Sequence, residues 1–313
     1  MVLDFSKIRT YSAFNRQNLV SLSDLVFPTD VVNITGVPND LIDLAERIKQ
    51  ATEKQAAVIM FIGAHVIKCG LSPFVIDLIK QGYLSHIAGN GATSIHDFEI
   101  SYLGATSEDV PNAINDGSFG MWEETCGWMN SAINEDATNG YGHAIASYMD
   151  RHLVKFPNTK HSVVYTAYKN NVPVTIHVTI GADIIHQHST ANFGAIGVAS
   201  GNDFYKFCKS VSNLEGGVFM NFGSAVTGAE VFLKALSISR NLGFPTKEIT
   251  TANFDLHPIG DCKLCIDNSD PNYYYRPRKN IVNRPTQKGG IGYNFELDHR
   301  VSIPMLHALL TKD

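Results

Sequence analysis

Short apolar runs alternate along the chain with stretches of helical periodicity. The residues from Ala57 to Ile62 form a run with no polar alternation, which is typical of a strand covered on both faces, and Gly63 ends it. Helically spaced apolar residues follow as far as Gly82. The same unit recurs, and the predicted strands are 57–62, 83–88, 172–180, 217–222, 249–254 and 292–297. Strands alternating with helices in this way predict an α/β protein with a doubly wound, mostly parallel sheet and helices on both faces.

No linker rich in Pro, Ser or Gly interrupts this series, so we expect a single domain over residues 1–313. Two segments depart from the pattern. Residues 109–148 are rich in Asn, Gly, Trp and acidic residues, and we interpret them as a lid or an insertion. Residues 261–288 hold tyrosines, basic residues and two cysteines without a long apolar run, so an exposed loop is expected there.

Composition narrows the classes of partner. The chain has 313 residues, of which 44% are hydrophobic and 18% charged, with a formal net charge of -5. This mildly acidic balance argues against a protein whose main task is to bind nucleic acid or an anionic membrane. No apolar run approaches the roughly 20 residues of a membrane helix. The N-terminal residues also lack the apolar stretch of a secretory signal. We therefore expect a cytoplasmic protein that binds neither nucleic acid nor membranes.

The cysteines and histidines give little support for a metal site. Cys262 and Cys265 form one CxxC pair, but no second pair follows at the spacing of a zinc site. Five cysteines in all, an odd and sparse set, argue against a disulfide framework. His186 and His188 form an HxH pair without a visible third ligand. We expect no metal, and we expect these histidines to bond a polar ligand whose amine meets the carboxylate of Asp183.

Glycine-containing turns follow several predicted strands. In a doubly wound sheet, ligands bind beyond the carboxyl ends of the strands, where glycines let backbone N–H groups approach a phosphate. The turn 89–94 is half of a dinucleotide fingerprint, because Ser94 stands where a third glycine is expected. A plain tight turn explains this segment equally well. The candidates for binding a cofactor are Gly63, His65, Gly89, Asn90, Gly91, Thr93, Gly181 and Ser224.

Lys279 is the candidate nucleophile. It lies between three tyrosines and an apolar pair, and neighbouring arginines together with partial burial would favour the uncharged amine. A basic surface loop that pairs with acidic groups is the alternative, and composition alone favours it. His96 and Asp97 follow the turn at 89–94, where an acidic side chain alternatively complements the helix dipole.

Taken in order, these motifs resemble the deoxyhypusine synthase family, in its shorter, bacterial-type branch. The likeness covers roughly Ala56 to Leu310. Its best stretches are 61–67, 89–97, 181–188, 214–218 and 275–279. In combination and in order these stretches are specific, whereas any one of them alone is not.

The resemblance implies an NAD-binding, Rossmann-like domain that forms a homotetramer with active sites between paired subunits. It implies that NAD accepts a hydride from spermidine, that the resulting imine is cleaved, and that a lysine carries the aminobutyl group to an acceptor amine before the hydride returns. Matched residue by residue to the family motifs, Lys279 is the carrier lysine. The same matching puts Asp183 in the cofactor and substrate cleft and residues 89–97 on the cofactor side. The leading hypothesis places Asp183, His96 and Asp97 around the polyamine substrate.

The chain departs from the family pattern in three places. The tryptophan expected before the lysine is missing, Asn221 stands where the family has a histidine that helps to shuttle protons, and Tyr273, Tyr274 and Tyr275 replace acidic residues. An asparagine cannot act as an acid or base, and cation–π contacts with tyrosine would have to meet the polyamine instead. These departures favour transfer to a small amine such as putrescine, as in homospermidine synthases, over transfer to a protein lysine.

Two alternatives stay open at this point. The first is an NAD-dependent polyamine oxidoreductase that never forms an imine on lysine. The second is a nucleotide-binding protein without catalysis, and the missing histidine and acidic positions motivate it.

Overall fold

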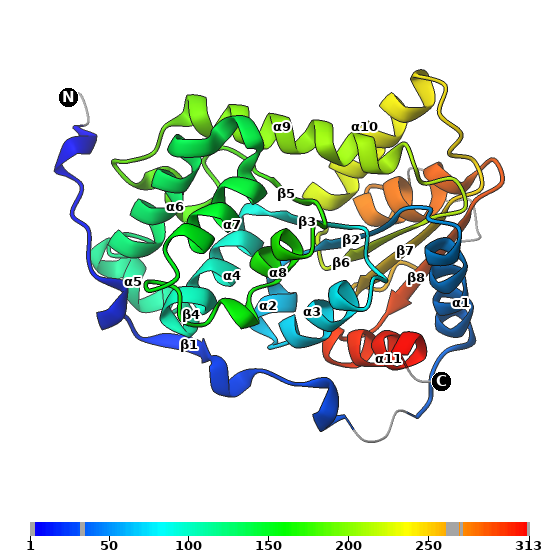
Figure 1. Cartoon of the computed structure of the whole chain (residues 1–313), viewed down its shortest axis with the longest axis horizontal. Coiled ribbons are helices and arrows are strands. Elements are labelled where there is room, and N and C mark those ends of the chain that lie inside the picture. The colour runs from blue at the N-terminus through cyan, green and yellow to red at the C-terminus, as the bar shows by residue number, and fades with distance from the viewer. Residues whose placement is uncertain (1–3, 32–34, 261–268, 270–271, 312–313) are drawn as a thin grey trace.

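A six-stranded parallel sheet forms the centre of the computed structural model, which describes residues 4–31, 35–260, 269 and 272–311 (Figure 1). The strand order is β5-β3-β2-β6-β7-β8, and every neighbouring pair is parallel. Counted in sequence order, these six strands lie as 3-2-1-4-5-6, which is the strand order of a Rossmann fold. The predicted α/β class and doubly wound sheet are therefore confirmed. The strands are β2 (Val58–Ile62), β3 (His86–Asn90), β5 (Val174–His177), β6 (Val218–Phe222), β7 (Thr250–Asp255) and β8 (Ile291–Glu296).

Helices cover both faces of the sheet, which explains why β2 has no polar alternation. Val58, Met60 and Ile62 point into one core cluster, and Ile59 and Phe61 point into the other. Figure 1 shows α9 and α10 above the sheet and α3 and α11 below it. The longer helices are α1 (Asn39–Glu53), α3 (Ser72–Lys80), α4 (Gly91–Leu103), α6 (Glu123–Asp136), α7 (Tyr141–Arg151), α9 (Phe193–Val211), α10 (Thr227–Asn241) and α11 (His299–Thr311). The shorter ones are α2 (Ala64–Lys68), α5 (Val110–Asp116) and α8 (Val163–Lys169). Among the described helices, none is long and apolar enough to cross a membrane.

Residues 109–148 form α5, α6 and most of α7, within the long connection between β3 and β5. Met129 of α6 and Ile145 of α7 are fully buried in the larger core cluster. This packing makes α6 and α7 part of the body of the protein. A role for the segment as a lid or an insertion stays a prediction, and α5, which has no buried residue, is its most exposed helix.

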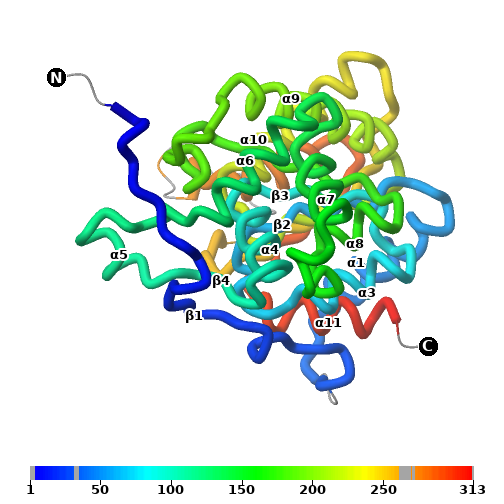
Figure 2. Tube along the Cα trace, turned by 60° about the vertical axis from the view of Figure 1, so that its left-hand side comes forward, coloured from blue at the N-terminus to red at the C-terminus, as the bar shows by residue number. Residues whose placement is uncertain are grey.

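The N-terminal segment runs along the outside of this helical layer (Figure 2). Its strand β1 (Asn18–Ser21) pairs with β4 (Ala105–Glu108) in a separate antiparallel sheet. A buried ion pair attaches it more firmly. Arg16 donates two hydrogen bonds of 2.8 Å to the Glu99 carboxylate in α4, and the side chains are only 3% and 1% exposed. Thr106 and Thr125 donate further hydrogen bonds to the same carboxylate.

We predict that Arg16→Ala lowers the free energy of unfolding by about 3–5 kcal/mol, because it leaves the Glu99 carboxylate buried without its cation. Urea denaturation measures this change. Arg151→Ala is the matched control, since its partner Glu135 and Arg151 itself are both about half exposed, and it should cost at most about 1 kcal/mol. Equal losses from the two variants would contradict the prediction.

Candidate functional site

The carboxyl ends of β2 and β6 meet at the point where the strand order reverses, which is where ligands bind in such sheets. Gly63 follows β2 and Gly223 follows β6. A Cβ atom on Gly63 would lie 2.7 Å from the Gly223 carbonyl oxygen, so no side chain fits between the two turns. Ser224 is buried, and its hydroxyl accepts a hydrogen bond of 2.9 Å from the Gly228 N–H at the start of α10. The two glycine turns therefore present backbone rather than side chains at this point.

His299, the first residue of α11, covers the same turn. A Cβ on Gly223 would lie 2.6 Å from His299 Nε2, and burial lowers the pKa of this histidine. Within the described part of the chain, the buried Nδ1 atom of His299 has no hydrogen-bond partner. Sequence reasoning missed this residue, although it follows the last predicted strand closely. The rule that selected the other strand ends would have found it there.

At the end of β3, the predicted glycine turn is a helix cap. The Asn90 side chain accepts hydrogen bonds from the N–H and the hydroxyl of Thr93, at 3.0 and 2.9 Å. The Thr93 hydroxyl also lies 2.9 Å from the carbonyl oxygen of Ile62, the last residue of β2. Gly89 fits closely against Thr93. These polar groups hold the turn to its neighbour, so the interpretation as a tight turn accounts for Asn90 and Thr93.

Asp183 lies directly against this turn. A Cβ on Gly91, the first residue of α4, would overlap the Asp183 carboxylate. Burial raises the pKa of Asp183 to about 6, and one carboxylate oxygen is buried without a hydrogen-bond partner among the described residues. A buried carboxylate without a cation is costly, and it is suited to receive the ammonium group of a ligand.

His186 stands beside Asp183. Its Nδ1 atom accepts hydrogen bonds of 3.2 Å from the N–H groups of Gly181 and Asp183, so the ring proton of the neutral histidine is on Nε2. That Nε2 atom lies 3.9 Å from the Asp183 carboxylate. Burial lowers the pKa of His186, which favours the neutral ring. Asp183 and His186 thus form an acid–base pair with an N–H donor and a carboxylate acceptor side by side.

The contacts of His96 and His65 are with groups other than Asp183 and His186. His96 is bonded at 2.7 Å through Nδ1 to the Thr106 hydroxyl, which itself donates to Glu99. Since that hydroxyl has only one proton, Nδ1 of His96 is the donor in this hydrogen bond. Burial lowers the pKa of His96 to about 4, so the ring is neutral at neutral pH. His65 is an exposed residue of α2.

Asp97 has a structural role. Its fully buried carboxylate accepts hydrogen bonds from the Ser162 hydroxyl and from the N–H groups of Val163 and Val164, at the start of α8. This is the arrangement of a helix cap, which anchors α8 to α4. Burial raises the pKa of Asp97 to about 6. With its hydrogen bonds occupied in this way, Asp97 is not brought together with Asp183, and we leave it out of the site.

Lys279 lies in the second half of the connection between β7 and β8, in a short π-helix, Arg278–Asn283. Its Nζ atom is over the rings of Tyr273 and Tyr274, at 5.9 and 5.3 Å from their centroids. The side chain is half-buried. The segment reaches the carboxyl edge of the sheet, because the Tyr275 hydroxyl donates a hydrogen bond of 2.6 Å to Asp255, the last residue of β7. The cation–π contacts expected for a polyamine are here made by the protein's own lysine.

Asn221 is buried inside the sheet. Its side-chain amide donates to Asn253 at 2.9 Å, and Asn253 donates to Asn294 at 2.9 Å, so that asparagines of β6, β7 and β8 form a hydrogen-bonded row. This row explains structurally why an asparagine stands here. The CxxC pair, Cys262 and Cys265, lies outside the described residues, and no group of three potential metal ligands occurs within them.

No protein-family model matches the chain, and no curated protein sequence matches it. Among solved structures, a conserved putative LOR/SDH protein from Methanococcus maripaludis S2 is 16% identical, with 88% of this chain and 70% of that chain covered and a TM-score of 0.53. The ternary complex of AgrE with ornithine and NAD+ is 14% identical, with a TM-score of 0.50 and 87% of this chain and 32% of that chain covered. The chain thus spans about a third of the length of AgrE.

A putative deoxyhypusine synthase from Entamoeba histolytica is also among the structural neighbours. It is 12% identical, 96% of each chain is covered, and the TM-score is 0.48. At these identities the likenesses concern the fold, which rests on the two matches with the higher TM-scores.

We predict that Gly91→Ala destabilises the protein by about 1–3 kcal/mol, because the new methyl group displaces the Asp183 carboxylate. Asp183→Ala in the same chain should remove most of that cost, which a double-mutant cycle measures. Gly127→Ala in α6 is the control, since nothing lies within 4 Å of its Cβ position, and it should stabilise by up to about 1 kcal/mol. Additive effects at positions 91 and 183 would disprove the contact.

A second prediction concerns pH. The pKa of Asp183 is higher in the folded protein than its usual 3.8, so its contribution to stability is present below about pH 4 and is lost as the pH rises through 6. Relative to wild type, Asp183→Asn should therefore become more stable by about 2–3 kcal/mol between pH 4 and pH 7. Denaturation of both proteins at the two pH values measures this difference. A difference that is the same at both would show that the carboxylate is solvated.

Proposed function

We propose that this chain binds NAD at the carboxyl edge of its sheet and oxidises an amine there. The proposal rests on the edge of the sheet where the strand order reverses, between β2 and β6. There Gly63 and Gly223 exclude side chains, and at the same edge Asp183 and His299 have buried polar atoms without partners among the described residues. AgrE, which has a related fold, has been solved with ornithine and NAD+, and this adds support.

The residues fit such a cofactor. The N–H groups of Gly63 and Gly223 are bonded to the carbonyl oxygens of Phe222 and Phe254, so these glycines contribute room for a phosphate beside the backbone. The start of α2 would offer N–H groups to that phosphate, and the buried Nδ1 of His299 offers one more polar contact. When bound, NAD supplies an acceptor that takes a hydride from the carbon next to an amine nitrogen and returns it later. Gly89, Gly181 and Ser224 line the neighbouring turns and remain proposed contacts.

Asp183 and His186 would handle the amine. At neutral pH the Asp183 carboxylate is largely ionised, so it can hold an ammonium group or accept its proton before oxidation. The His186 ring is fixed by the two backbone N–H groups that bind Nδ1, and its Nε2 atom lies 3.9 Å from the carboxylate, too far for a hydrogen bond, so both groups are free to meet a ligand. His96 and His65 are further from this role, because His96 is bonded within the β4 region.

In the finer form of the proposal, the chain transfers an aminobutyl group from spermidine or a related polyamine. The Lys279 amine adds to the oxidised carbon, the bond from that carbon to the departing nitrogen breaks, and the diamine fragment leaves with a proton. Attack by a small amine such as putrescine, or by a protein lysine, then breaks the bond to Nζ and frees Lys279. A cytoplasmic homotetramer with sites between subunits belongs to the same proposal.

One observation favours a second candidate, an NAD-dependent amine oxidoreductase without a lysine intermediate. The Lys279 ammonium lies over Tyr273 and Tyr274, so it is already in contact with the protein's own rings. Such an enzyme needs only the cofactor turns and the Asp183–His186 pair. Ornithine, the ligand of AgrE, is then a substrate to test alongside spermidine and putrescine.

The test combines NAD titration by calorimetry with borohydride trapping in the presence of NAD and spermidine. Wild type should bind NAD and gain an aminobutyl mass at Lys279, which peptide mass spectrometry locates. Lys279→Ala should lose the adduct and still reduce NAD, whereas Asp183→Asn should bind NAD and reduce it at least about tenfold more slowly.

Lys288→Ala, an exposed lysine later in the same connection, is the control and should behave as wild type. Reduction of NAD without an adduct at any lysine would favour the oxidoreductase. Tight NAD binding without turnover of any amine would indicate a nucleotide-binding protein without catalysis. Absence of NAD binding would overturn the whole proposal.

A further inference from the structure

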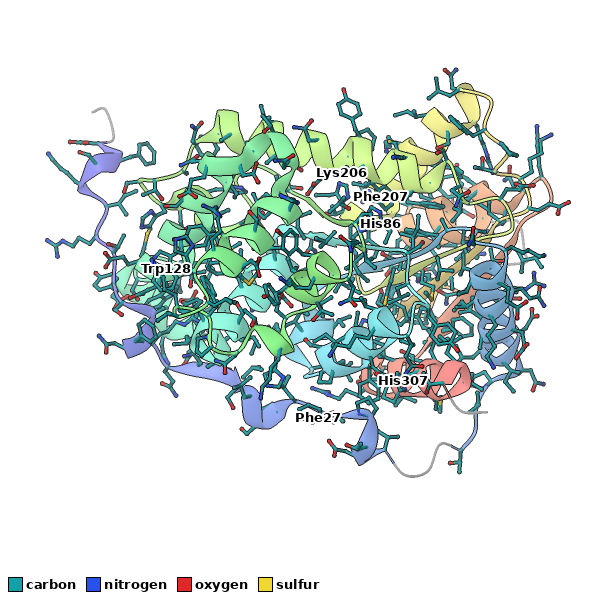
Figure 3. The ribbon with its side chains drawn as sticks, in the orientation of Figure 1. Phe27, His86, Trp128, Lys206, Phe207 and His307 are labelled. Carbon is teal, nitrogen blue, oxygen red and sulfur yellow. The ribbon has the colours of Figure 1, made fainter. Side chains whose placement is uncertain are left out.

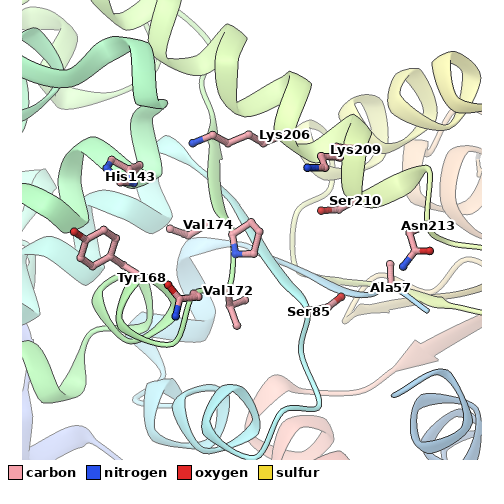
Figure 4. Close-up of a pocket in the computed structure, with 12 residues that line it drawn as sticks. Ala57, Ser85, His143, Tyr168, Val172, Val174, Lys206, Lys209, Ser210 and Asn213 are labelled. Atoms are coloured by element: carbon pink, nitrogen blue, oxygen red, sulfur yellow. The ribbon is translucent and has the colours of Figure 1, made fainter. Parts of the chain in front are cut away.

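A cavity of about 590 Å³ lies at the amino edge of the sheet, opposite to the site described above (Figure 4). Ala57, Ser85 and Pro173 line it, and each precedes a strand, whereas the candidate cofactor turns all follow strands. The remaining walls come from α7, α8 and α9. Because the sheet itself separates the two edges, the cavity is distinct from the proposed NAD site.

One wall of the cavity is cationic. Lys206 and Lys209 are three residues apart in α9, so their side chains leave the same face of the helix, and Figure 4 shows both directed over the cavity. Neither is in an ion pair with any carboxylate of the described chain. Among the described residues, the ammonium group of Lys206 donates a hydrogen bond to the backbone carbonyl of Asn139. Lys206 acts electrostatically on the buried carboxylate of Asp203, three residues earlier in α9, without an ion pair to it. Two neighbouring cations without an ion-paired carboxylate favour a bound anion.

The opposite wall is aromatic and apolar. The rings of His143 and Tyr168 meet edge to face, with centroids 5.3 Å apart, and Val172 and Val174 continue the surface. Burial lowers the pKa of His143, which favours the neutral imidazole. A flat ring on the ligand would pack against this wall while its charge stays near α9.

The floor of the cavity is rigid. Ser210, beside Lys209, is bonded at 2.7 Å to Nδ1 of His86, and His86 Nε2 is bonded at 2.8 Å to Thr175. Burial lowers the pKa of His86 to about 3, so this ring stays neutral. Figure 3 shows His86 and Phe207 beneath α9, close to Lys206, and the two rings lie 5.4 Å apart. A cavity held in shape in this way needs little rearrangement to bind a ligand.

We propose that this cavity binds a phosphate ester of a ring-bearing molecule, of the size of a nucleoside monophosphate. Its volume lies within the usual range of roughly 300–1,000 Å³ for small-molecule pockets. A phosphate rather than a carboxylate matches the wall, because two ammonium groups and the Ser210 hydroxyl can meet its two charges and several oxygens. The ring would contact Tyr168 and His143.

Uridine monophosphate is the probe, titrated calorimetrically into the full chain with and without saturating NAD. It should bind with a dissociation constant on the order of 0.1 mM or tighter in both conditions. The variant Lys206→Met/Lys209→Met should bind at least about tenfold more weakly. Lys54→Met/Lys80→Met removes the same charge from two exposed lysines elsewhere and should bind as wild type does. Thermal unfolding checks that all variants remain folded.

Two further ligands separate the parts of the proposal. Uridine and inorganic phosphate should each bind at least about tenfold more weakly than uridine monophosphate, because each lacks one half of the contacts. Equal binding of uridine would overturn the anion site, and equal binding of phosphate would overturn the aromatic wall. Displacement by NAD, indifference to the lysine substitutions, or no binding to wild type would overturn the proposal. Failure of NAD to bind would leave these comparisons valid.

Discussion

The parallel pairing of β2 with both β3 and β6 is the constraint on which the rest of the structure depends. A strand in this position is buried on both faces, so every residue from Val58 to Ile62 must be apolar and must fit one of two core clusters. The chain then leaves β2 for β3 on one side and comes back to β6 on the other. That reversal brings Gly63 and Gly223 together, and only glycine tolerates the approach.

Some buried polar groups of the protein have hydrogen-bond partners, and others have none among the described residues. Asp97 at the start of α8 and Glu99 beside Arg16 have their oxygens bonded, and they fix helices and the N-terminal segment in place. Asp183 and His299 each retain a buried polar atom without a partner in the described chain. Unsatisfied groups of this kind are costly, and these two lie at the carboxyl edge of the sheet, which supports the proposal that a ligand completes the site.

The two edges of the sheet differ in chemistry. The carboxyl edge combines glycine turns with a carboxylate, which suits a dinucleotide and an amine, and the amino edge combines lysines with aromatic rings, which suits a phosphate ester. A buried chain of hydrogen bonds runs between them, from Ser210 through His86 and Thr175 to His177, the last residue of β5.

The sequence alone determined the elements and their class. All six central strands were predicted, because uniform apolar runs ended by glycine or polar turns report burial on both faces, and the turns after β2 and β6 were located correctly. The predicted turn at 89–94 was wrong, since Gly89 and Asn90 belong to β3 and α4 begins at Gly91. The sequence also identified Asp183 and Lys279 as unusual residues. What it left open was which polar side chains serve the fold: Asp97 and Asn90 were predicted as site residues, and in the structure their side chains make capping hydrogen bonds.

Only the tertiary structure decided how these residues meet. Whether Asp183 is paired, whether His299 covers Gly223, and which rings Lys279 contacts all depend on segments far apart in the chain, and no local pattern encodes such distances. The cavity at the amino edge was invisible for the same reason, since its lysines, aromatic rings and strand starts come from separate elements. Local periodicity reports the burial of each segment, whereas the partners of a polar group are fixed only when the helices pack on the sheet.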